Sequence, residues 1–546
     1  MSDQTFLNRI PPPLRQALSW TIQILGGGSL LAIIDGRGNF LAAWGAYTLL
    51  FALAAAAIYG AWKVSGSDKA TLAPAQLAFG ARLALGGLLL IFLPILGYAN
   101  SVEHQAGYVF HDAYIRDTQA WELATASDPL SDAFSGDYSG DQYGGLLALS
   151  AAIYRLLSPD AHRPLMIVLL GAAAAACGTL LLGKAAGSWF GPGIGATAAW
   201  IFALYPESVL LGSSQMREPF VLAAVAMTFF GLAQAHKEGH ETGRFWPAIA
   251  WVVAAGLILF LIQPLAAFIA IGVLLGAWVL DPGAWLSSQR SRVLLPATLL
   301  AGLLVVALLV GGAILANLPS LQGSGPFGVL FAWLQNNFQF QSYLTERASG
   351  MFQKLLDSAG EQWRWLIVTV YGIAQPVLPA VVGDPDAAPL MRTIGFLRAA
   401  GWYALAPFLV YGLTGALRAK GEARRMQLTW LSVAGWAWII IAALNAGGDQ
   451  WDNPRYRAIL LAWQALLAAW AWGWARQRGD AWLYRWLAVE AVFVGMFTEW
   501  YASRYFTSLP HLDIRIMIAA TLVITLLILV GGWLKDRKTK SRGDRL

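Results

Sequence analysis

The chain has too few charged residues to cover the surface of a water-soluble protein of its length. Hydrophobic residues make up 57% of the 546 residues, and charged residues make up 12%, about half the usual quarter. The apolar residues gather in runs of about 20, the length that crosses a bilayer as a helix. The composition therefore excludes a soluble, disordered or disulfide-rich fold. It predicts an all-α polytopic membrane protein.

About 14 of these runs are candidate transmembrane helices. The stretch Trp363–Val382 is also apolar, but it contains Pro376 and Pro379 and is therefore predicted to be interfacial or re-entrant. The 14 expected spans are Leu14–Ile34, Phe40–Trp62, Leu77–Tyr98, Leu165–Leu182, Phe190–Leu210, Phe220–Gln234, Trp246–Ile262, Pro264–Leu280, Leu294–Ala316, Phe396–Leu417, Leu428–Leu444, Ile459–Trp474, Leu483–Trp500 and Ile514–Leu534.

The Lys and Arg residues predict the orientation of these spans. Short loops rich in Lys and Arg stay in the cytoplasm, and with 14 spans such loops all fall on one side. We therefore expect both termini to be cytoplasmic, in a bacterial-type inner membrane. The loop and tail residues concerned are Lys63, Lys69, Lys237, Arg244, Arg290, Arg292, Arg418, Lys420, Arg424, Arg425, Arg476, Arg478, Lys535, Arg537, Lys538, Lys540, Arg542 and Arg545.

The long loop Asn100–Arg163 is then extracytoplasmic and holds much of the acidic charge. Asp117 and Trp121 recur at helical spacing, which predicts a helix over Ala113–Ala126. A second amphipathic stretch, Tyr143–Leu157, is predicted to lie flat on the membrane surface. Carboxylates held over a membrane by such helices suit chemistry at a lipid head group.

Four segments of the chain resemble a known superfamily. They read RDTQAWELA, DQYGGLLALSAAIYRLL, GPGIGATAAWIFALYPESVLLGSSQMREPFVLAAV and NPRYRAILLAWQALLAAWAW. Their order and setting resemble the GT-C superfamily of integral membrane glycosyltransferases, in the protein O-mannosyltransferase and aminoarabinose-transferase-like group. The resemblance covers residues 80–235 and 445–475. The Asp-Glu pair often seen in that group's first loop is absent, since Ala113 follows Asp112 and Thr118 follows Asp117.

The resemblance implies a polyprenyl-phosphate-dependent hexosyl- or pentosyltransferase that glycosylates an acceptor hydroxyl outside the cytoplasm, usually with inversion. Such a transfer needs a base for the acceptor proton and cations for the departing lipid phosphate. Asp117 is the first candidate base and Asp112 the second. Arg455 and Arg457, with Tyr456 between them, are the candidate donor-phosphate ligands; ion pairing with Asp449 or Asp452 is the alternative.

Further candidate substrate contacts are Arg217, Glu218, Asp141 and Tyr143, although Arg217 and Glu218 are equally well explained as a buried structural pair. No cofactor is assigned with certainty from the sequence, and a divalent metal, held by Asp137 and Asp141, is a weaker alternative. The expected partners are the lipid-linked donor, a lipid, glycan or protein acceptor, and membrane lipids, with no nucleic acid.

The chain is expected to fall into four regions. These are an N-terminal extra hairpin (1–76), a GT-C-like module (77–316) that includes the acidic loop 100–163, a second outer loop with a re-entrant segment (317–395), and C-terminal helices with a basic tail (396–546). Two other function classes stay open, a transporter or flippase for lipid-linked saccharides and a surface-polysaccharide polymerase or ligase. Paired broken helices would favour the transporter, and a large late outer loop would favour the polymerase.

Overall fold

The computed structural model confirms an all-helical chain in the part that it describes. That part comprises residues 12–135, 138, 141, 143–241, 246–280, 353, 356–357, 360–377, 381, 387–422, 424–445, 454–503, 508 and 510–543. Every regular element in these residues is an α- or 3-10 helix. The expected span Leu294–Ala316 lies outside them, as does most of the second outer loop.

Eight of the described helices are long and apolar enough to cross a membrane, or nine if one broken pair counts as a span. The protein is therefore a multi-pass membrane protein. The eight are α2 (Pro12–Asp35), α3 (Phe40–Val64), α4 (Lys69–Leu96), α8 (Leu165–Phe190), α11 (Glu218–Glu241), α20 (Pro389–Arg418), α21 (Arg425–Asn445) and α25 (Ile514–Gly543).

The other expected spans are helical but differ in form. The run Phe190–Leu210 is the broken pair α9 (Pro192–Leu204) and α10 (Pro206–Gly212), interrupted before Pro206. Helices α12 (Trp246–Ile262) and α13 (Pro264–Val279) have only 17 and 16 residues. Helices α23 (Leu461–Arg478) and α24 (Ala481–Ala502) are long enough but do not reach the same hydropathy. The predicted re-entrant stretch contains α18 (Arg364–Ala374), which is too short to cross a bilayer.

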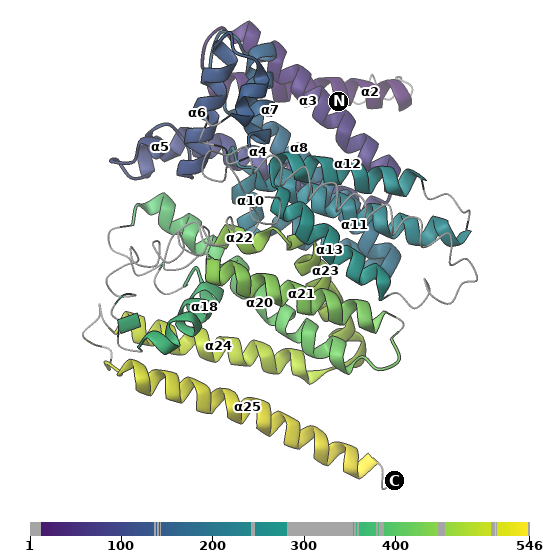
Figure 1. Ribbon diagram of the computed structural model, residues 1–546, viewed down its shortest axis with the longest axis vertical. Helices are drawn as coiled ribbons and strands as arrows, with labels where there is room; N and C mark the ends of the chain where they lie inside the picture. Colours follow the sequence, from purple (N-terminus) through teal and green to yellow (C-terminus); the bar gives the residue numbers. More distant parts are fainter. Residues whose placement is uncertain are drawn as a thin grey trace, which may run out of the picture. The chain divides into compact units, whose positions relative to one another are not determined.

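The described chain divides into two compact units. Figure 1 labels the helices that they contain. Unit 1 comprises Met1–Leu181, Ser208–Met227 and Leu257–Pro264. It contains α2, α3 and α4 and the helices of the acidic loop. These are α5 (Val102–Gln105), α6 (His111–Thr125), the 3-10 helix η1 (Leu130–Phe134) and α7 (Gly145–Leu157).

The two longer loop helices confirm the predicted amphipathic pair. Helix α6 packs along α7, and their shared core contains Leu123, Leu147, Ala151 and Tyr154. Helix α7 begins after Gly144, which has a left-handed backbone (φ +75°), a conformation that costs glycine little. Its outward face leaves Leu156 exposed, as suits a helix at a membrane surface.

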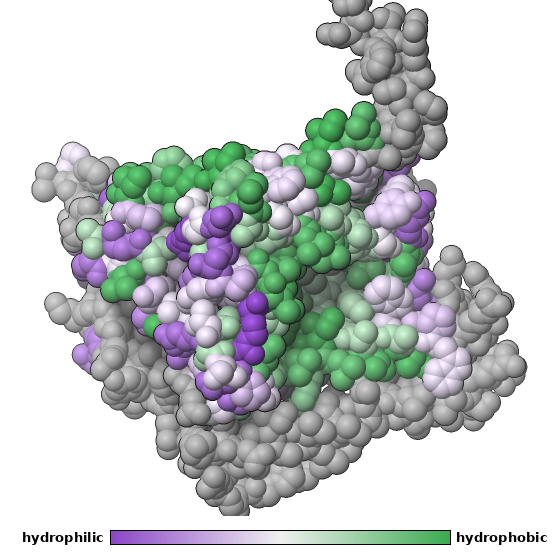
Figure 2. Space-filling model, turned by 90° about the horizontal axis from the view of Figure 1, so that it is seen from above, coloured by the Kyte–Doolittle hydropathy of each residue, from purple (hydrophilic) through white to green (hydrophobic). Residues whose placement is uncertain are grey.

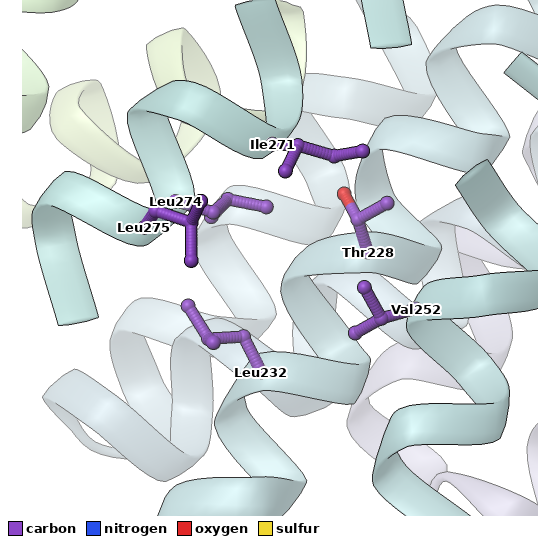
Figure 3. A pocket seen from close by; sticks show the side chains of 6 residues that line it. All are labelled: Thr228, Leu232, Val252, Ile271, Leu274 and Leu275. Atoms are coloured by element: carbon purple, nitrogen blue, oxygen red, sulfur yellow. The ribbon is translucent and has the colours of Figure 1, made fainter. Parts of the chain in front are cut away.

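Unit 2 contains the C-terminal helices, including α22 (Pro454–Ala458) and the 3-10 helix η3 (Glu361–Trp363). Helix α23 is buried on nearly all sides, because it packs against α9, α20 and α21. Helices α11, α12 and α13 enclose a small pocket lined by Thr228, Leu232, Val252, Ile271, Leu274 and Leu275 (Figure 3). This pocket offers one hydroxyl and no charge, so it does not suit a sugar or a phosphate.

Large apolar side chains are exposed along the predicted spans. On α2, α3 and α4 they include Ile22, Leu41, Leu53 and Ile95. In the face shown in Figure 2, hydrophobic residues form broad areas and hydrophilic ones are confined to smaller groups. Helix α25 is the extreme case, since only 6% of the most apolar 18-residue stretch within Ile514–Arg537 is buried. Apolar area on this scale is stable only against lipid or another apolar partner.

Candidate active site in the first large loop

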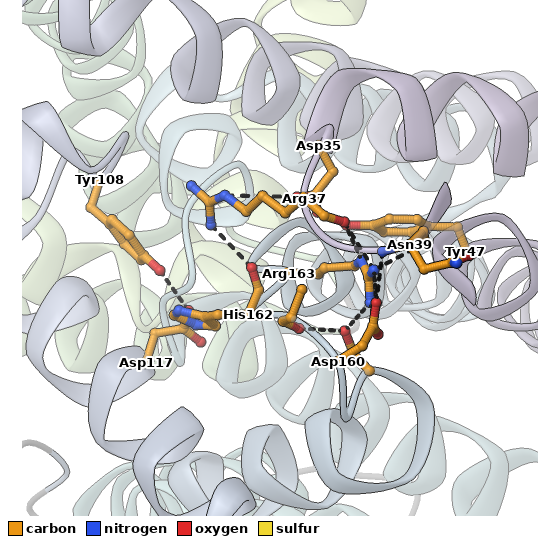
Figure 4. Close-up of polar contacts among 11 residues, drawn as sticks. Asp35, Arg37, Asn39, Tyr47, Tyr108, Asp117, Asp160, His162 and Arg163 are labelled. Carbon is orange, nitrogen blue, oxygen red and sulfur yellow. Dashed lines mark hydrogen bonds and ion pairs between the residues drawn. The ribbon is translucent and has the colours of Figure 1, made fainter. Parts of the chain in front are cut away.

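Asp117 lies at the centre of a buried polar cluster in unit 1. Its carboxylate accepts hydrogen bonds from the hydroxyls of Tyr108 and Tyr154, both at 2.7 Å. It also lies 2.8 Å from Nε2 of His162, and Figure 4 shows Asp117 beside His162 and Tyr108. Only 2% of the residue is exposed. The carboxylate of Asp117 therefore joins α6 to α7 and to the segment that precedes α8.

The surroundings keep Asp117 ionised. Burial raises the pKa of this carboxyl, but the hydrogen bonds from His162, Tyr154 and Tyr108, with the charge of His162, outweigh burial and hold the pKa below its usual range. The ring of His162 stacks on Trp121 at 5.4 Å between centroids. Because both oxygens of Asp117 are occupied by protein donors, an acceptor hydroxyl would have to displace one of them.

Asp112 lies one and a half turns earlier on the same helix and is exposed. It occupies the first turn of α6, where the helix dipole favours a negative charge. The two candidate bases are thus placed differently, because Asp112 is accessible and Asp117 is enclosed.

Arg116 brings the candidate substrate contacts together. Its buried guanidinium donates to the backbone oxygen of Gln215, which fixes α6 against the turn between α10 and α11. Burial lowers the pKa of Arg116; the nearby carboxylates of Asp141, Glu218 and Asp112 oppose this effect, and the charge of Arg217 adds to it.

Asp141, Tyr143 and Arg217 form one side of this cluster. Asp141 accepts from the backbone N–H groups of Leu146 and Leu147, both at 3.2 Å, and so caps α7. The Arg217 guanidinium lies 4.0 Å from Asp141 and 5.3 Å from the centre of the Tyr143 ring. The predicted pairing of Arg217 with Glu218 is absent from the described contacts, where Arg217 meets Asp141 instead.

Glu218 is the least satisfied carboxylate of the cluster. It is 5% exposed, and its Oε2 has no hydrogen-bond partner within the described residues. It begins α11, where the helix N-terminus compensates part of its charge.

The metal alternative finds no support in the described part of the chain. No group of three or more His, Cys, Asp or Glu side chains there is arranged to hold a metal ion. Asp141 is already engaged by α7 and Arg217. Asp137, the other residue of that alternative, lies outside the described residues.

The candidate phosphate ligands lie in unit 2 and are largely buried. The Arg457 guanidinium lies 3.8 Å from the centre of the Trp402 ring and donates to the backbone oxygen of Ile373 at 3.3 Å. Its Nε is buried and meets no acceptor within the described residues. Arg455 lies over the ring of Tyr456 and donates to its hydroxyl at 3.1 Å. Asp449 and Asp452, the alternative partners, are outside the described residues.

A third arginine lies close to Arg457. The Arg398 guanidinium makes two hydrogen bonds to the Glu207 carboxylate, at 2.6 and 2.9 Å, and both side chains are buried. Tyr205 hydrogen-bonds Arg457. Burial lowers the pKa of Arg457. Tyr205 and Glu207 oppose this effect, whereas the charge of Arg398 adds to it. Glu207 is paired with Arg398, so positive charge is left at Arg457.

The sequence predicts Asp117, Arg457 and several of their neighbours as site residues, but it does not predict Arg116 or His162. Arg116 was visible only as a residue four positions after Asp112, and His162 only as a loop histidine without a metal motif. Their partners lie 99 and 45 residues away along the chain, beyond the reach of any periodicity.

Comparison with known proteins gives a remote structural likeness. No family model matches the chain, and no curated protein matches it. Among solved structures it is similar to the oligosaccharyltransferase of Archaeoglobus fulgidus in complex with Zn and sulfate, with a TM-score of 0.38 and 13% identity over 75% of this chain and 51% of that one.

Two further structures of the oligosaccharyltransferase from that organism show similar values. One is in complex with an inhibitory peptide and a dolichol-phosphate, with a TM-score of 0.37 and 14% identity. The other is tethered to an acceptor peptide, with a TM-score of 0.38 and 15% identity. Each match covers 83% of this chain and 54% of the other. The present chain thus spans about half the length of these neighbours. They have the GT-C fold named by the sequence resemblance, but a likeness this remote assigns neither an activity nor a ligand.

Proposed function

We propose that the protein is a membrane glycosyltransferase that moves a hexose or pentose from a polyprenyl-phosphate donor to an acceptor hydroxyl on the extracytoplasmic face. The observation that carries this proposal is the gathering of Asp112, Asp141, Arg217 and Glu218 around the buried Arg116. Arg116, Asp141, Arg217 and Glu218 come from three segments that resemble GT-C enzymes, and Asp112 precedes the first of them. All five residues belong to unit 1.

The reaction needs one base. The acceptor oxygen attacks the anomeric carbon on the face opposite the phosphate, the bond from that carbon to the phosphate oxygen breaks, and the base takes the acceptor proton. Asp112 is exposed and Asp117 is buried, so an acceptor hydroxyl reaches the carboxylate of Asp112 more easily. We assign Asp112 as the base and Asp117 as the residue that fixes α6.

The leaving group is a polyprenyl phosphate, which needs positive charge at its oxygens. Arg457, held against Trp402 with its Nε unsatisfied in the described contacts, supports a role in binding this phosphate. Arg455, with Tyr456, is its predicted neighbour in that role. A guanidinium can bind two phosphate oxygens at once, which an ammonium group cannot reproduce.

The remaining assignments follow from the sequence. We assign the protein to a bacterial-type cytoplasmic membrane with both termini in the cytoplasm, and we keep the four-region division at residues 76, 316 and 395. Its acceptor is a lipid, a glycan or a protein. The transporter and polymerase alternatives are not favoured by any described contact, and most of the late loop on which the polymerase depends lies outside the described residues.

A transfer assay tests the proposal. The purified chain in lipid vesicles is given a panel of labelled polyprenyl-phosphate hexoses and pentoses, with the membrane fraction of its source cell as acceptor. Release of polyprenyl phosphate should require the chain, and Asp112→Asn should slow it about a hundredfold or more. Lys63→Ala, an exposed change at the far end of α3, should leave the rate unchanged. If Asp112→Asn is fully active, the assignment of Asp112 as the base fails.

A further inference from the structure

The N-terminal hairpin makes contacts that a pair of additional membrane spans does not require. The turn that joins α2 to α3 lies directly against residues 158–163, the segment that links α7 to α8 (Figure 4). Both segments belong to unit 1. The contacts are polar and specific, so they define one relative position of the hairpin turn and the large loop.

Arg163 is the centre of this junction. It is fully buried, and its guanidinium donates to the backbone oxygens of Arg37 and Asn39 in the hairpin turn. The same guanidinium holds both oxygens of Asp160, at 2.6 and 2.7 Å, and the Ser158 hydroxyl at 2.6 Å. Hydrogen bonds to Arg163 hold the pKa of Asp160 well below its usual range. One arginine thus ties together the two segments.

The hairpin turn contributes contacts of its own. Its Asn39 N–H donates to Oδ2 of Asp160 at 2.9 Å, and the Arg37 guanidinium donates to the backbone oxygen of His162 at 3.2 Å. The turn itself is held at its start, where the Tyr47 hydroxyl of α3 donates to Asp35. Arg37 also lies 3.8 Å from Asp35.

The two segments approach so closely that one position between them admits no side chain. Gly38 has a left-handed backbone (φ +64°), and a Cβ there would lie 2.6 Å from Ala161 Cβ, 2.6 Å from Asp160 Oδ2 and 2.7 Å from an Arg163 nitrogen. Gly36, in the same turn, has φ +63°, but its Cβ would meet only one atom, at 3.8 Å. The turn therefore contains two glycines with the same backbone demand, and only one of them faces the large loop.

His162 connects this junction to the candidate active site. Its backbone oxygen is held by Arg37, and its ring contacts Asp117 and stacks on Trp121, both on α6. A shift of the hairpin turn is thus transmitted through His162 to α6, which carries Asp112 in its first turn.

We propose that the N-terminal hairpin acts as a strut that positions α6 for glycosyl transfer, with Arg37, Gly38 and Arg163 as positioning residues. This inference rests on the proposed function only for its effect on the rate. Its structural claim is that contacts with the hairpin turn hold α6 in place and protect its backbone from exchange, and this claim does not depend on the reaction.

The matched glycines supply the experiment. Gly38→Ala and Gly36→Ala are compared in the full-length protein, since both strain the backbone and only the first pushes the two segments apart. Hydrogen–deuterium exchange is measured over residues 111–125 and 158–163. We expect Gly38→Ala to speed exchange in both segments about tenfold or more, and Gly36→Ala to change the hairpin turn alone.

A second pair of variants guards against a Gly38→Ala protein that does not fold. Arg37 is half-buried, so Arg37→Ala removes the bond to His162 with little loss of packing. We expect it to speed exchange of residues 111–125 roughly two- to tenfold. Arg37→Lys should restore part of the protection.

Turnover gives the functional outcome. With the polyprenyl-phosphate donors described above, Gly38→Ala and Arg37→Ala should lower kcat about tenfold and leave the KM for the donor unchanged, because misplaced groups slow the chemical step. If residues 111–125 exchange no faster in Gly38→Ala and Arg37→Ala than in Gly36→Ala, the hairpin turn does not position α6 and the proposal is wrong. A wild-type protein without transfer activity would instead refute the proposed function, and the exchange result would still decide the strut.

Discussion

At the scale of single residues, the two carboxylates of α6 separate by environment. Asp112 and Asp117 are both Asp residues on one helix, yet the first is exposed and the second is enclosed by two tyrosines and a histidine. The sequence predicts a helix over Ala113–Ala126, which includes Asp117 and leaves Asp112 just before its start, and it ranks Asp117 first. Only the distant partners of Asp117, supplied by α7 and by residue 162, show that its lone pairs are already in use.

The first prediction concerns the stability that Asp117 provides. Asp117→Asn replaces an ionised carboxylate with an amide. The amide oxygen cannot accept all three contacts, and the amide NH2 group would face the Tyr108, Tyr154 and His162 groups that now contact the carboxylate. We expect the free energy of unfolding to fall by about 1–3 kcal/mol, the usual consequence of leaving buried polar groups unsatisfied. Thermal unfolding in detergent measures this change. Asp128→Asn, at an exposed position of the same loop, is the control. Equal stabilities of the two variants would contradict a stabilising role of the hydrogen bonds to Asp117.

The second prediction concerns Arg457. Arg457→Lys keeps the charge but loses the planar fork and its stacking on Trp402. We expect donor binding to weaken about tenfold, and further in Arg457→Ala. Binding of a labelled polyprenyl-phosphate sugar and thermal stability are measured on the same samples.

Arg478→Lys is the matched control, because Arg478 also stacks on a tryptophan, Trp474, in α23 and pairs with Glu422. Its replacement should leave donor binding unchanged. If Arg457→Lys lowers only stability, then Arg457 is a structural residue and not a phosphate ligand.

At the scale of helices, hydropathy locates the centre of each span but not its ends. The expected span Leu77–Tyr98 is the helix α4, which begins at Lys69, because Asp68 caps it by accepting from the Ala70 N–H. Likewise α8 continues to Phe190, beyond the expected end at Leu182. At the start of α4, cap geometry rather than apolar content therefore decides where the helix begins.

The third prediction concerns the contact between α7 and residue 261 within unit 1. A Cβ on Gly145 would overlap the carbonyl oxygen of Leu261 and lie 2.6 Å from its carbonyl carbon. Backbone cannot rotate away as a side chain can, so Gly145→Ala should lower the free energy of unfolding by about 1–3 kcal/mol. Gly45→Ala on α3 is the control, because a Cβ there meets no heavy atom within 4 Å. Chemical denaturation of both variants makes the comparison, and equal loss in the two would refute a close contact at Gly145.

At the scale of the whole molecule, composition alone predicts the fold class, because a chain with 12% charged residues has to bury or immerse its apolar surface. The pairing of distant segments is a different problem. Arg116 with Gln215, His162 with Asp117 and Arg398 with Glu207 join residues 99, 45 and 191 positions apart. Such pairs carry no local periodicity, so the sequence predicts the residue types of a site without predicting which of them meet.

The last prediction tests the topology of the chain. Lys and Arg are concentrated in one set of connecting loops, and the cost of translocating them places these loops in the cytoplasm. Ser135, exposed in the first large loop, should then lie outside. In a background with Cys177, the single cysteine, replaced by Ala, Ser135→Cys should react in intact cells with a maleimide that cannot cross membranes. Lys420→Cys, exposed in a basic connection, should react only after permeabilisation. The reverse pattern would invert the protein and move the loop with Asp112 to the cytoplasm, where a donor presented on the outer leaflet could not reach it.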